Sequence, residues 1–153
     1  MKLCSDVLNA LQGKTLVTAE SLTGGGIGSA LTAVSGSSAV YKGGIISYTN
    51  WVKENVLGVS GEILETYGAV SGPVAEAMAI GVREKLQADV AVSVTGLAGP
   101  GGDEYGNPVG TVYIGYADRR CAIVERYAFS GSREEVRIQT VEAALRLILQ
   151  QNV

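Results

Sequence analysis

The chain has 153 residues, of which 46% are hydrophobic and 18% charged, so we expect one folded domain over residues 1–153 with a substantial core. Its net charge of −3 offers no general basic surface for nucleic acid, and no stretch approaches the ~18 apolar residues of a membrane span. The sequence contains no histidine, which excludes Ser-His-Asp and Cys-His catalysis and disfavours zinc and iron sites.

The first half of the chain predicts helices that alternate with short strands. Apolar spacing, glycines and a capping serine at Ser71 with Pro73 in the first turn set the boundaries. The predicted helices cover residues 2–12, 27–34, 51–57, 60–67 and about 72–86, and the predicted strands cover 14–19 and 40–49.

The second half predicts a strand over 89–95, a long glycine-rich loop over 96–108, and two strands near 109–117 and 121–129 that form a hairpin. A final helix over 133–150 closes the chain. Alternating strands and helices followed by a hairpin predict an α/β fold, a three-layer α/β/α sandwich with a mixed β-sheet.

The predicted location is cytoplasmic. The first residues lack the apolar run of a signal peptide, and the two cysteines, Cys4 and Cys121, form no disulfide framework. Neither cysteine has an obvious activating partner in the sequence, so we expect both to be inert.

Three polar segments follow three predicted strands, and we expect them to share one pocket because ligands bind beyond the carboxyl ends of strands in open α/β sheets. The first segment is Glu20-Ser21-Leu22-Thr23-Gly24-Gly25-Gly26. Ser21 lies between a strand and a helix, where backbone N–H groups suit a substrate anion or a developing oxyanion. A simple capping turn at the helix start fits the same residues.

The second segment is Ser47-Tyr48-Thr49-Asn50-Trp51-Val52-Lys53, which ends a strand and begins a helix. Without histidine, a lysine is the natural base for a serine nucleophile, provided that desolvation or a positive neighbour lowers its pKa. Tyr48 and Lys53 are therefore candidates to act on Ser21. A solvated helix lysine beside a strand tyrosine is the alternative.

The third segment is Thr95-Gly96-Leu97-Ala98-Gly99-Pro100-Gly101-Gly102. Consecutive small residues leave backbone N–H groups open in a concave nest that suits phosphate, although a flexible surface loop also fits. Arg133 and Arg137, in the first turns of the last helix, are further candidates to pair with a phosphate or carboxylate, or else they are surface arginines.

These motifs resemble those of the CinA C-terminal domain family. The first segment resembles its E-S-C-T-G-G signature, the second is similar to Y-S-N-x-x-K, and the third resembles T-G-I-A-G-P-x-G. Gly68-Ala69-Val70-Ser71 resembles G-A-V-S, and Pro108-Val109-Gly110-Thr111-Val112 also matches. Five motifs in the family's order, covering residues 5 to 150, identify the chain as a member.

The resemblance implies a CinA C-terminal-like fold and a nicotinamide-nucleotide amidase, which hydrolyses nicotinamide mononucleotide to nicotinate mononucleotide and ammonia without metal or cofactor. It implies Ser21 as nucleophile, with Lys53 and Tyr48 as catalytic partners, and a homodimer or higher homo-oligomer. The residues expected to bind the small-molecule nucleotide are Thr23, Gly24, Gly25, Asn50, Thr95, Gly96, Gly99, Gly101, Gly102 and Arg133. Either Lys53 or Tyr48 is then the immediate base.

Two positions depart from the family pattern. Leu22 replaces the usual cysteine beside the serine, which we expect to alter packing more than chemistry. Asn107 stands where a lysine often precedes Pro-Val-Gly, so that phosphate binding is weaker or depends on Arg133. Longer members carry an N-terminal domain associated with ADP-ribose pyrophosphatase activity, and we expect no such activity here.

Two other functions remain open from the sequence. One is a non-catalytic nucleotide-binding or regulatory module on the same scaffold, and the other is an amidase for a different small amide. Retention of both Ser21 and Lys53 favours catalysis, because a phosphate-binding nest does not require that pair.

Overall fold

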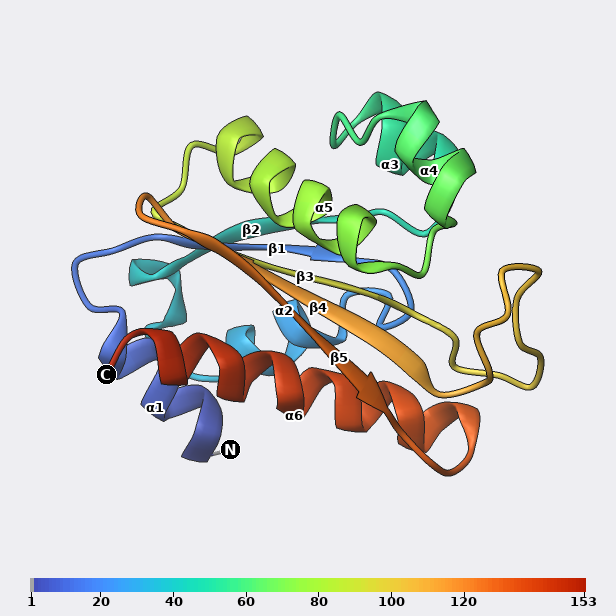
Figure 1. The fold of residues 1–153 in the computed structure, drawn as a ribbon. Helices are drawn as coiled ribbons and strands as arrows, with labels where there is room; N and C mark the ends of the chain where they lie inside the picture. The colour runs from blue at the N-terminus through green and yellow to red at the C-terminus, as the bar shows by residue number, and fades with distance from the viewer. Residues whose placement is uncertain (1) are drawn as a thin grey trace.

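The computed structural model describes residues 2–153, and a mixed sheet forms its centre (Figure 1). The five strands lie in the order β2-β1-β3-β4-β5. β1 pairs in parallel with β2 and with β3, β4 is antiparallel to β3, and β5 is antiparallel to β4. The strands are β1 (Leu16–Glu20), β2 (Tyr41–Ile46), β3 (Val90–Gly96), β4 (Thr111–Ala117) and β5 (Ala122–Ala128).

Helices cover both faces of this sheet, which confirms the three-layer α/β/α sandwich. α5 packs along one face, with α3 and α4 on the same side, while α1, α2 and α6 cover the other face (Figure 1). The helices are α1 (Lys2–Ala10), α2 (Gly26–Thr32), α3 (Asn50–Asn55), α4 (Gly61–Tyr67), α5 (Gly72–Lys85) and α6 (Arg133–Gln151).

The pleat of β1 decides which layer each of its side chains enters. Successive side chains of a strand point to opposite faces; accordingly Leu16 belongs to the core beneath α1, α2 and α6, and Val17 to the core beneath α5. By the same alternation, Glu20 faces the α2 layer. Ser21, the next residue, faces the opposite layer, where α3 lies.

The predicted elements are all present, with most of their ends shifted by one to three residues. A 3₁₀ helix at Ser37–Ala39 was not predicted. β2 ends at Ile46 rather than residue 49, because its partner strand β1 ends at Glu20, which pairs with Ile46, and the chain then turns into α3. α1 ends at Ala10, two residues before the predicted end, and continues as a turn.

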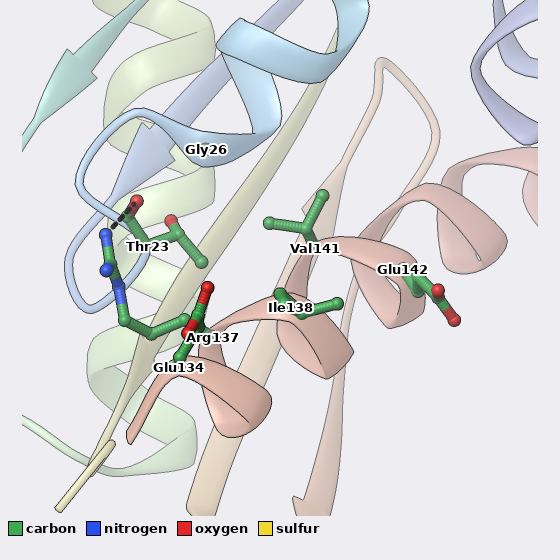
Figure 2. A pocket seen from close by; sticks show the side chains of 7 residues that line it. All are labelled: Thr23, Gly26, Glu134, Arg137, Ile138, Val141 and Glu142. Carbon is green, nitrogen blue, oxygen red and sulfur yellow. Dashed lines mark hydrogen bonds between the residues drawn. The ribbon is translucent and has the colours of Figure 1, made fainter. Parts of the chain in front are cut away.

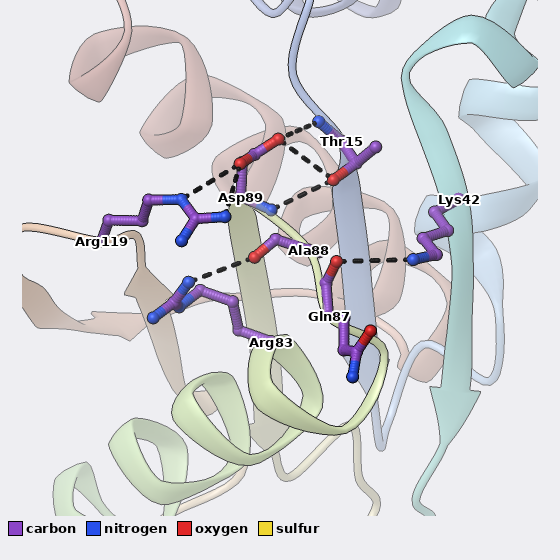
Figure 3. Close-up of polar contacts among 7 residues, drawn as sticks. All are labelled: Thr15, Lys42, Arg83, Gln87, Ala88, Asp89 and Arg119. Carbon is purple, nitrogen blue, oxygen red and sulfur yellow. Dashed lines mark hydrogen bonds and ion pairs between the residues drawn. The ribbon is translucent and has the colours of Figure 1, made fainter.

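The amino end of the sheet is fastened by Asp89 (Figure 3). Its carboxylate accepts the backbone N–H of Thr15 at 2.9 Å and the guanidinium of Arg119 at 3.2 Å, and its own N–H donates to the Thr15 hydroxyl at 3.1 Å. The backbone hydrogen bond from Thr15, assisted by Arg119, lowers the pKa of Asp89. These contacts join the segments that enter β1 and β3.

The opposite edge gathers the segments that the sequence singled out. β1, β2 and β3 are parallel, so the residues after Glu20, Ile46 and Gly96 emerge together. β5 ends at the same edge, because it is antiparallel to β4, which is itself antiparallel to β3. α6 therefore begins there too, bringing Arg133 to the same place.

Candidate active site

Ser21 and Lys53 meet at this edge. The ammonium nitrogen Nζ of Lys53 donates to Oγ of Ser21 at 3.1 Å and to the carbonyl of Ser47 at 2.8 Å. Ser21 is 7% exposed and Lys53 1% exposed. The lysine is therefore neither a solvated helix residue nor distant from the serine, and its amine is already at hydrogen-bond distance from the hydroxyl that it would deprotonate.

Burial shifts the protonation of this lysine. Desolvation lowers the pKa of Lys53 from 10.5 to about 8, because an apolar environment disfavours the charged amine. No carboxylate within residues 2–153 forms an ion pair with it. A pKa of about 8 leaves about a tenth of the molecules with a neutral Lys53 at pH 7, in the form that accepts a proton.

Backbone hydrogen bonds fix both partners. The N–H of Ser21 donates to the carbonyl of Val94 in β3 at 3.1 Å, so the serine is held at the end of the central strand. On the other side, the hydroxyl of Thr49 caps α3 by accepting the N–H of Val52. Capping orders the first turn of this short helix. Lys53 comes directly after Val52, so its backbone is ordered by the same cap.

Ser21 and Lys53 open into a cavity of about 350 Å³. Most of the residues expected to act on or bind the substrate line it: Ser21, Tyr48, Asn50, Lys53, Thr95, Gly96, Gly99, Gly101 and Arg133. Five further residues, none of them among the residues expected to act on or bind the substrate, complete the lining: Leu22, Ala69, Val70, Leu97 and Ala98. They supply apolar walls; all five lie within the quoted motifs, but their apolar side chains did not suggest a binding role.

Four of the expected binding residues do not line this cavity: Thr23, Gly24, Gly25 and Gly102. The Thr23 side chain points the other way, because its hydroxyl donates to the buried carboxylate of Glu20 at 2.6 Å. Gly24 and Gly25 adopt positive φ angles of 57° and 101°, which turn the chain away towards α2. The N–H of Gly24 donates to the carbonyl of Ser21 and closes this turn.

Three backbone N–H groups of the turn have no hydrogen-bond acceptor within residues 2–153, namely those of Leu22, Thr23 and Gly25. The helix-start groups of Ile27 and Gly28 are different, because they donate to Glu20 at 2.8 and 3.0 Å. Donors for an oxyanion therefore remain in the turn beside Ser21 rather than at the start of α2.

Tyr48 lies at the rim of the cavity and is 59% exposed. Its hydroxyl accepts from the guanidinium of Arg133 at 3.2 Å, and Arg133 also donates to the carbonyl of Gly99 at 2.6 Å. Lys53 contacts Tyr48 through the tyrosine carbonyl at 3.5 Å. The arginine thus joins the second and third polar segments across the rim.

The glycine-rich loop adds further backbone donors. The N–H groups of Ala98, Gly99 and Gly101 have no acceptor within residues 2–153. At the strand end, the hydroxyl of Thr95 donates to the carbonyl of Ala69 at 2.8 Å, which fastens the loop to the segment before α5.

The two departures from the family pattern have packing roles. Leu22 is 4% exposed and belongs to the core beneath α6. Asn107 donates its side-chain N–H groups to the carbonyl of Val70 at 3.0 Å and to the carboxylate of Asp103 at 2.9 Å. Its amide therefore closes the loop, and it does not line the cavity.

Two features are absent from residues 2–153. No group of three or more side chains of the metal-ligating types lies close enough together to hold an ion. None of the described helices has the length and apolar character needed to cross a membrane.

Comparisons with known proteins agree with this architecture. The CinA C-terminal domain model matches residues 2–152. A CinA-like protein of Parasynechococcus marenigrum (strain WH8102) is 50% identical over 147 residues, covering 94% of this chain and 35% of its own. A CinA-like protein of Geobacter sp. (strain M21) is 48% identical over 133 residues, covering 87% of this chain and 32% of its own. The chain thus spans about a third of the length of these curated relatives.

Solved structures match over nearly their whole length. A CinA superfamily protein from Klebsiella pneumoniae 700603 superposes with a TM-score of 0.95 at 36% identity, covering 98% of this chain and 95% of that one. A competence/damage-inducible protein from Agrobacterium tumefaciens gives a TM-score of 0.95 at 39% identity, covering 99% and 94%. With the family match over residues 2–152, these findings show that the chain belongs to the CinA C-terminal domain family.

Proposed function

We propose that this protein is a Ser/Lys amidohydrolase that hydrolyses the carboxamide of nicotinamide mononucleotide to nicotinate mononucleotide and ammonia. The observation that carries the proposal is the buried contact of 3.1 Å between Lys53 Nζ and Ser21 Oγ. A lysine with its pKa lowered to about 8, and with no carboxylate partner, suits a base better than a structural ion pair.

The first half of the reaction is acylation of Ser21. Neutral Lys53 takes the hydroxyl proton as Oγ forms a bond to the carboxamide carbon, and the carbonyl oxygen becomes an oxyanion. Unpaired N–H groups of the turn beside Ser21 are the donors available to stabilise it. The intermediate collapses as the C–N bond breaks, and the Lys53 ammonium gives its proton to the departing nitrogen, which leaves as ammonia.

The second half is hydrolysis of the nicotinoyl ester. Water attacks the ester carbon while Lys53 accepts one of its protons, and breaking the C–Oγ bond returns that proton to Ser21. The direct contact between Lys53 and Ser21 supports Lys53 rather than the Tyr48 hydroxyl as the immediate base, since the tyrosine hydroxyl is bonded to Arg133 instead.

Polar groups at the rim support a nucleotide substrate. Arg133 uses two of its five donors on Gly99 and Tyr48, which leaves others for a phosphate. The unpaired N–H groups of Ala98, Gly99 and Gly101 suit the same group. A pyridinium ring held at Ser21 has an electron-poor carboxamide, which favours attack by a serine activated only by lysine.

The test is a panel of pyridine amides, including nicotinamide mononucleotide and free nicotinamide, incubated with purified protein while ammonia is measured. We expect release from the mononucleotide and its loss in Ser21→Ala, because a missing nucleophile costs orders of magnitude in turnover. Release from another amide alone would assign a different substrate. Near-parental release by folded Ser21→Ala would remove Ser21 from the nucleophile role.

A further inference from the structure

Arg137 contacts the turn that carries Ser21, although the residue itself lies on α6 (Figure 2). Its guanidinium donates from Nε to the carbonyl of Leu22 at 2.9 Å and from Nη2 to the carbonyl of Thr23 at 3.2 Å. Two adjacent peptide groups of the turn are therefore held by one planar cation. Both carbonyls therefore face Arg137 on α6.

The guanidinium has no other evident role. Arg137 does not line the cavity at Ser21; it borders a second cavity of about 320 Å³ between the turn and α6. Glu134 and Glu142 also border that second cavity, but no carboxylate within residues 2–153 forms an ion pair with Arg137. Its interactions are with the peptide backbone of the turn.

The turn is fastened from the inner side as well. The buried carboxylate of Glu20 accepts the hydroxyl of Thr23 at 2.6 Å and the N–H of Ile27 at 2.8 Å. The turn thus lies between a carboxylate, which holds the Thr23 hydroxyl and the start of α2, and a guanidinium that holds two carbonyls of the turn. The Thr23 N–H, which belongs to the same peptide unit as the Leu22 carbonyl, is left without an acceptor.

We propose that Arg137 is a positioning residue that sets the oxyanion donors of the Ser21 turn. A peptide carbonyl bonded to a cation is polarised, and its own N–H becomes a stronger donor. Arg137 therefore strengthens the Thr23 N–H through the Leu22 carbonyl, and it strengthens the turn-closing Gly24 N–H through the Thr23 carbonyl. Arg137 therefore acts on the substrate indirectly, through the backbone of the turn, whereas Arg133 lines the substrate cavity itself.

This inference rests on Ser21 being the nucleophile, so its experiment measures the serine itself rather than turnover of one substrate. A fluorophosphonate probe forms a bond from Ser21 Oγ to phosphorus, releases fluoride, and passes the hydroxyl proton to Lys53; its P=O oxygen needs the same donors as an amide oxyanion. The second-order labelling rate is followed by mass spectrometry in Arg137→Gln and Arg137→Lys, with thermal unfolding measured in parallel. Arg146→Gln is the matched control, because Arg146 lies on the same helix and pairs only with Glu142, at 3.9 Å.

We expect Arg137→Gln to slow labelling by about tenfold, less than the roughly 10²–10³ found for deleting an oxyanion donor outright, because the donor itself remains. Arg137→Lys should recover part of the rate, and Arg146→Gln should label like the parent. On the amide substrate, kcat should fall while KM stays near the parental value. Parental labelling by a folded Arg137→Gln protein overturns the positioning role alone, and so does a rate that falls only in proportion to unfolding. A parent whose Ser21 does not label at all overturns the nucleophile assignment on which both proposals rest.

Discussion

Lys53 is among the largest fully buried side chains, and within residues 2–153 its hydrogen-bond partners are the Ser21 hydroxyl and the carbonyls of Ser47 and Tyr48. Such an environment stabilises the ammonium less than water does, which is why the pKa of Lys53 falls. The same desolvation that prepares a base also weakens the fold, so Lys53 links activity to stability.

Replacing Lys53 by arginine separates base catalysis from charge. Arginine keeps the positive charge but is not deprotonated in proteins, so we expect Lys53→Arg and Lys53→Met both to lose at least about 10²-fold in kcat. Parental activity should rise with pH along one ionisation near 8, the value to which burial lowers the Lys53 pKa. Steady-state kinetics of ammonia release across pH provide the measurement.

The Ser21→Ala protein serves as the inactive reference in that experiment. An active Lys53→Arg enzyme would contradict the base assignment, and the Tyr48 hydroxyl would become the next candidate. An arginine variant that raises only KM would instead indicate that Lys53 binds substrate.

Lys53→Met should also change stability in a pH-dependent way. The folded pKa of about 8 lies below the ordinary 10.5, so the folded state binds fewer protons than the unfolded state between these values and parental stability rises with pH. Below pH 8 the full cost of burying the charge is present. We expect Lys53→Met to raise the free energy of unfolding by about 1–2 kcal/mol at pH 7, because burying an apolar side chain carries no cost of desolvating a charge.

Urea unfolding of both proteins at pH 7 and pH 10 checks this. The difference should shrink at the higher pH, since the neutral lysine no longer carries a buried charge. A Met variant that is less stable than the parent at pH 7 would mean that the lost bonds to Ser21 and Ser47 outweigh desolvation.

Sequence reasoning anticipated the Ser21–Lys53 pair and most of the cavity lining, because both residues follow strands whose carboxyl ends share one edge. It assigned Thr23 to the substrate, whereas the side chain is bonded to Glu20. Thr23 lies in the turn after β1, where the direction of a side chain follows from the local backbone conformation and not from a periodic pattern. Arg137 was only a candidate because its carbonyl partners lie 115 and 114 residues away in the chain.

At the scale of the elements, Glu20 connects β1 to α2. It is 2% exposed, and its carboxylate accepts the N–H groups of Ile27 and Gly28 as well as the Thr23 hydroxyl. No side chain caps α2 at Gly25, the residue before its first turn. The carboxylate from the adjacent strand therefore satisfies donors that a cap residue usually satisfies.

Removing that carboxylate should destabilise the fold strongly. Glu20→Ala leaves two backbone donors of α2 without an acceptor, and each buried unpaired donor costs about 1–3 kcal/mol, so we expect a loss of about 3 kcal/mol. Glu20→Gln should lose less, because one amide oxygen still accepts. Chemical unfolding gives the free energies, and Glu142→Gln on the exposed face of α6 is the control. Equal stability of Glu20→Ala and the parent would show that water replaces the carboxylate.

The order and type of the elements were predictable because each has a local signature. Ser71 caps α5 through the N–H of Val74, as the pattern of serine followed by Gly-Pro predicts. The strand ends were less predictable: β2 stops at Ile46, which pairs with the last residue of β1, and such a long-range pairing leaves no mark in the local sequence. The 3₁₀ turn at Ser37–Ala39 is too short to produce a periodic signal.

For the molecule as a whole, one end of the sheet carries the candidate site and the other contributes to stability. Residues around Ser21 hold the candidate chemistry, while Asp89 and its partners fasten the opposite end (Figure 3). We expect Asp89→Ala to lower the free energy of unfolding by about 1–2 kcal/mol, since the Thr15 N–H loses its acceptor. Ammonia release per folded molecule should stay parental.

Asp6→Ala is the comparison for that variant. It breaks an exposed ion pair with Lys2, so its effect should stay below about 0.5 kcal/mol. An Asp89→Ala protein that is folded but catalytically impaired would show that the two ends of the sheet are coupled after all.

The positions of the chain ends have a consequence for how this fold tolerates attachments. The C-terminus is held at the amino end of the sheet, where Asn152 bonds to the Tyr116 hydroxyl, and the N-terminal helix α1 packs beside α6. The helices nearest the two ends, α1 and α6, therefore lie on the opposite side of the sheet from α3, the helix that carries Lys53 (Figure 1). We therefore expect a tethered partner domain or an affinity tag at either end to leave the entrance to Ser21 open.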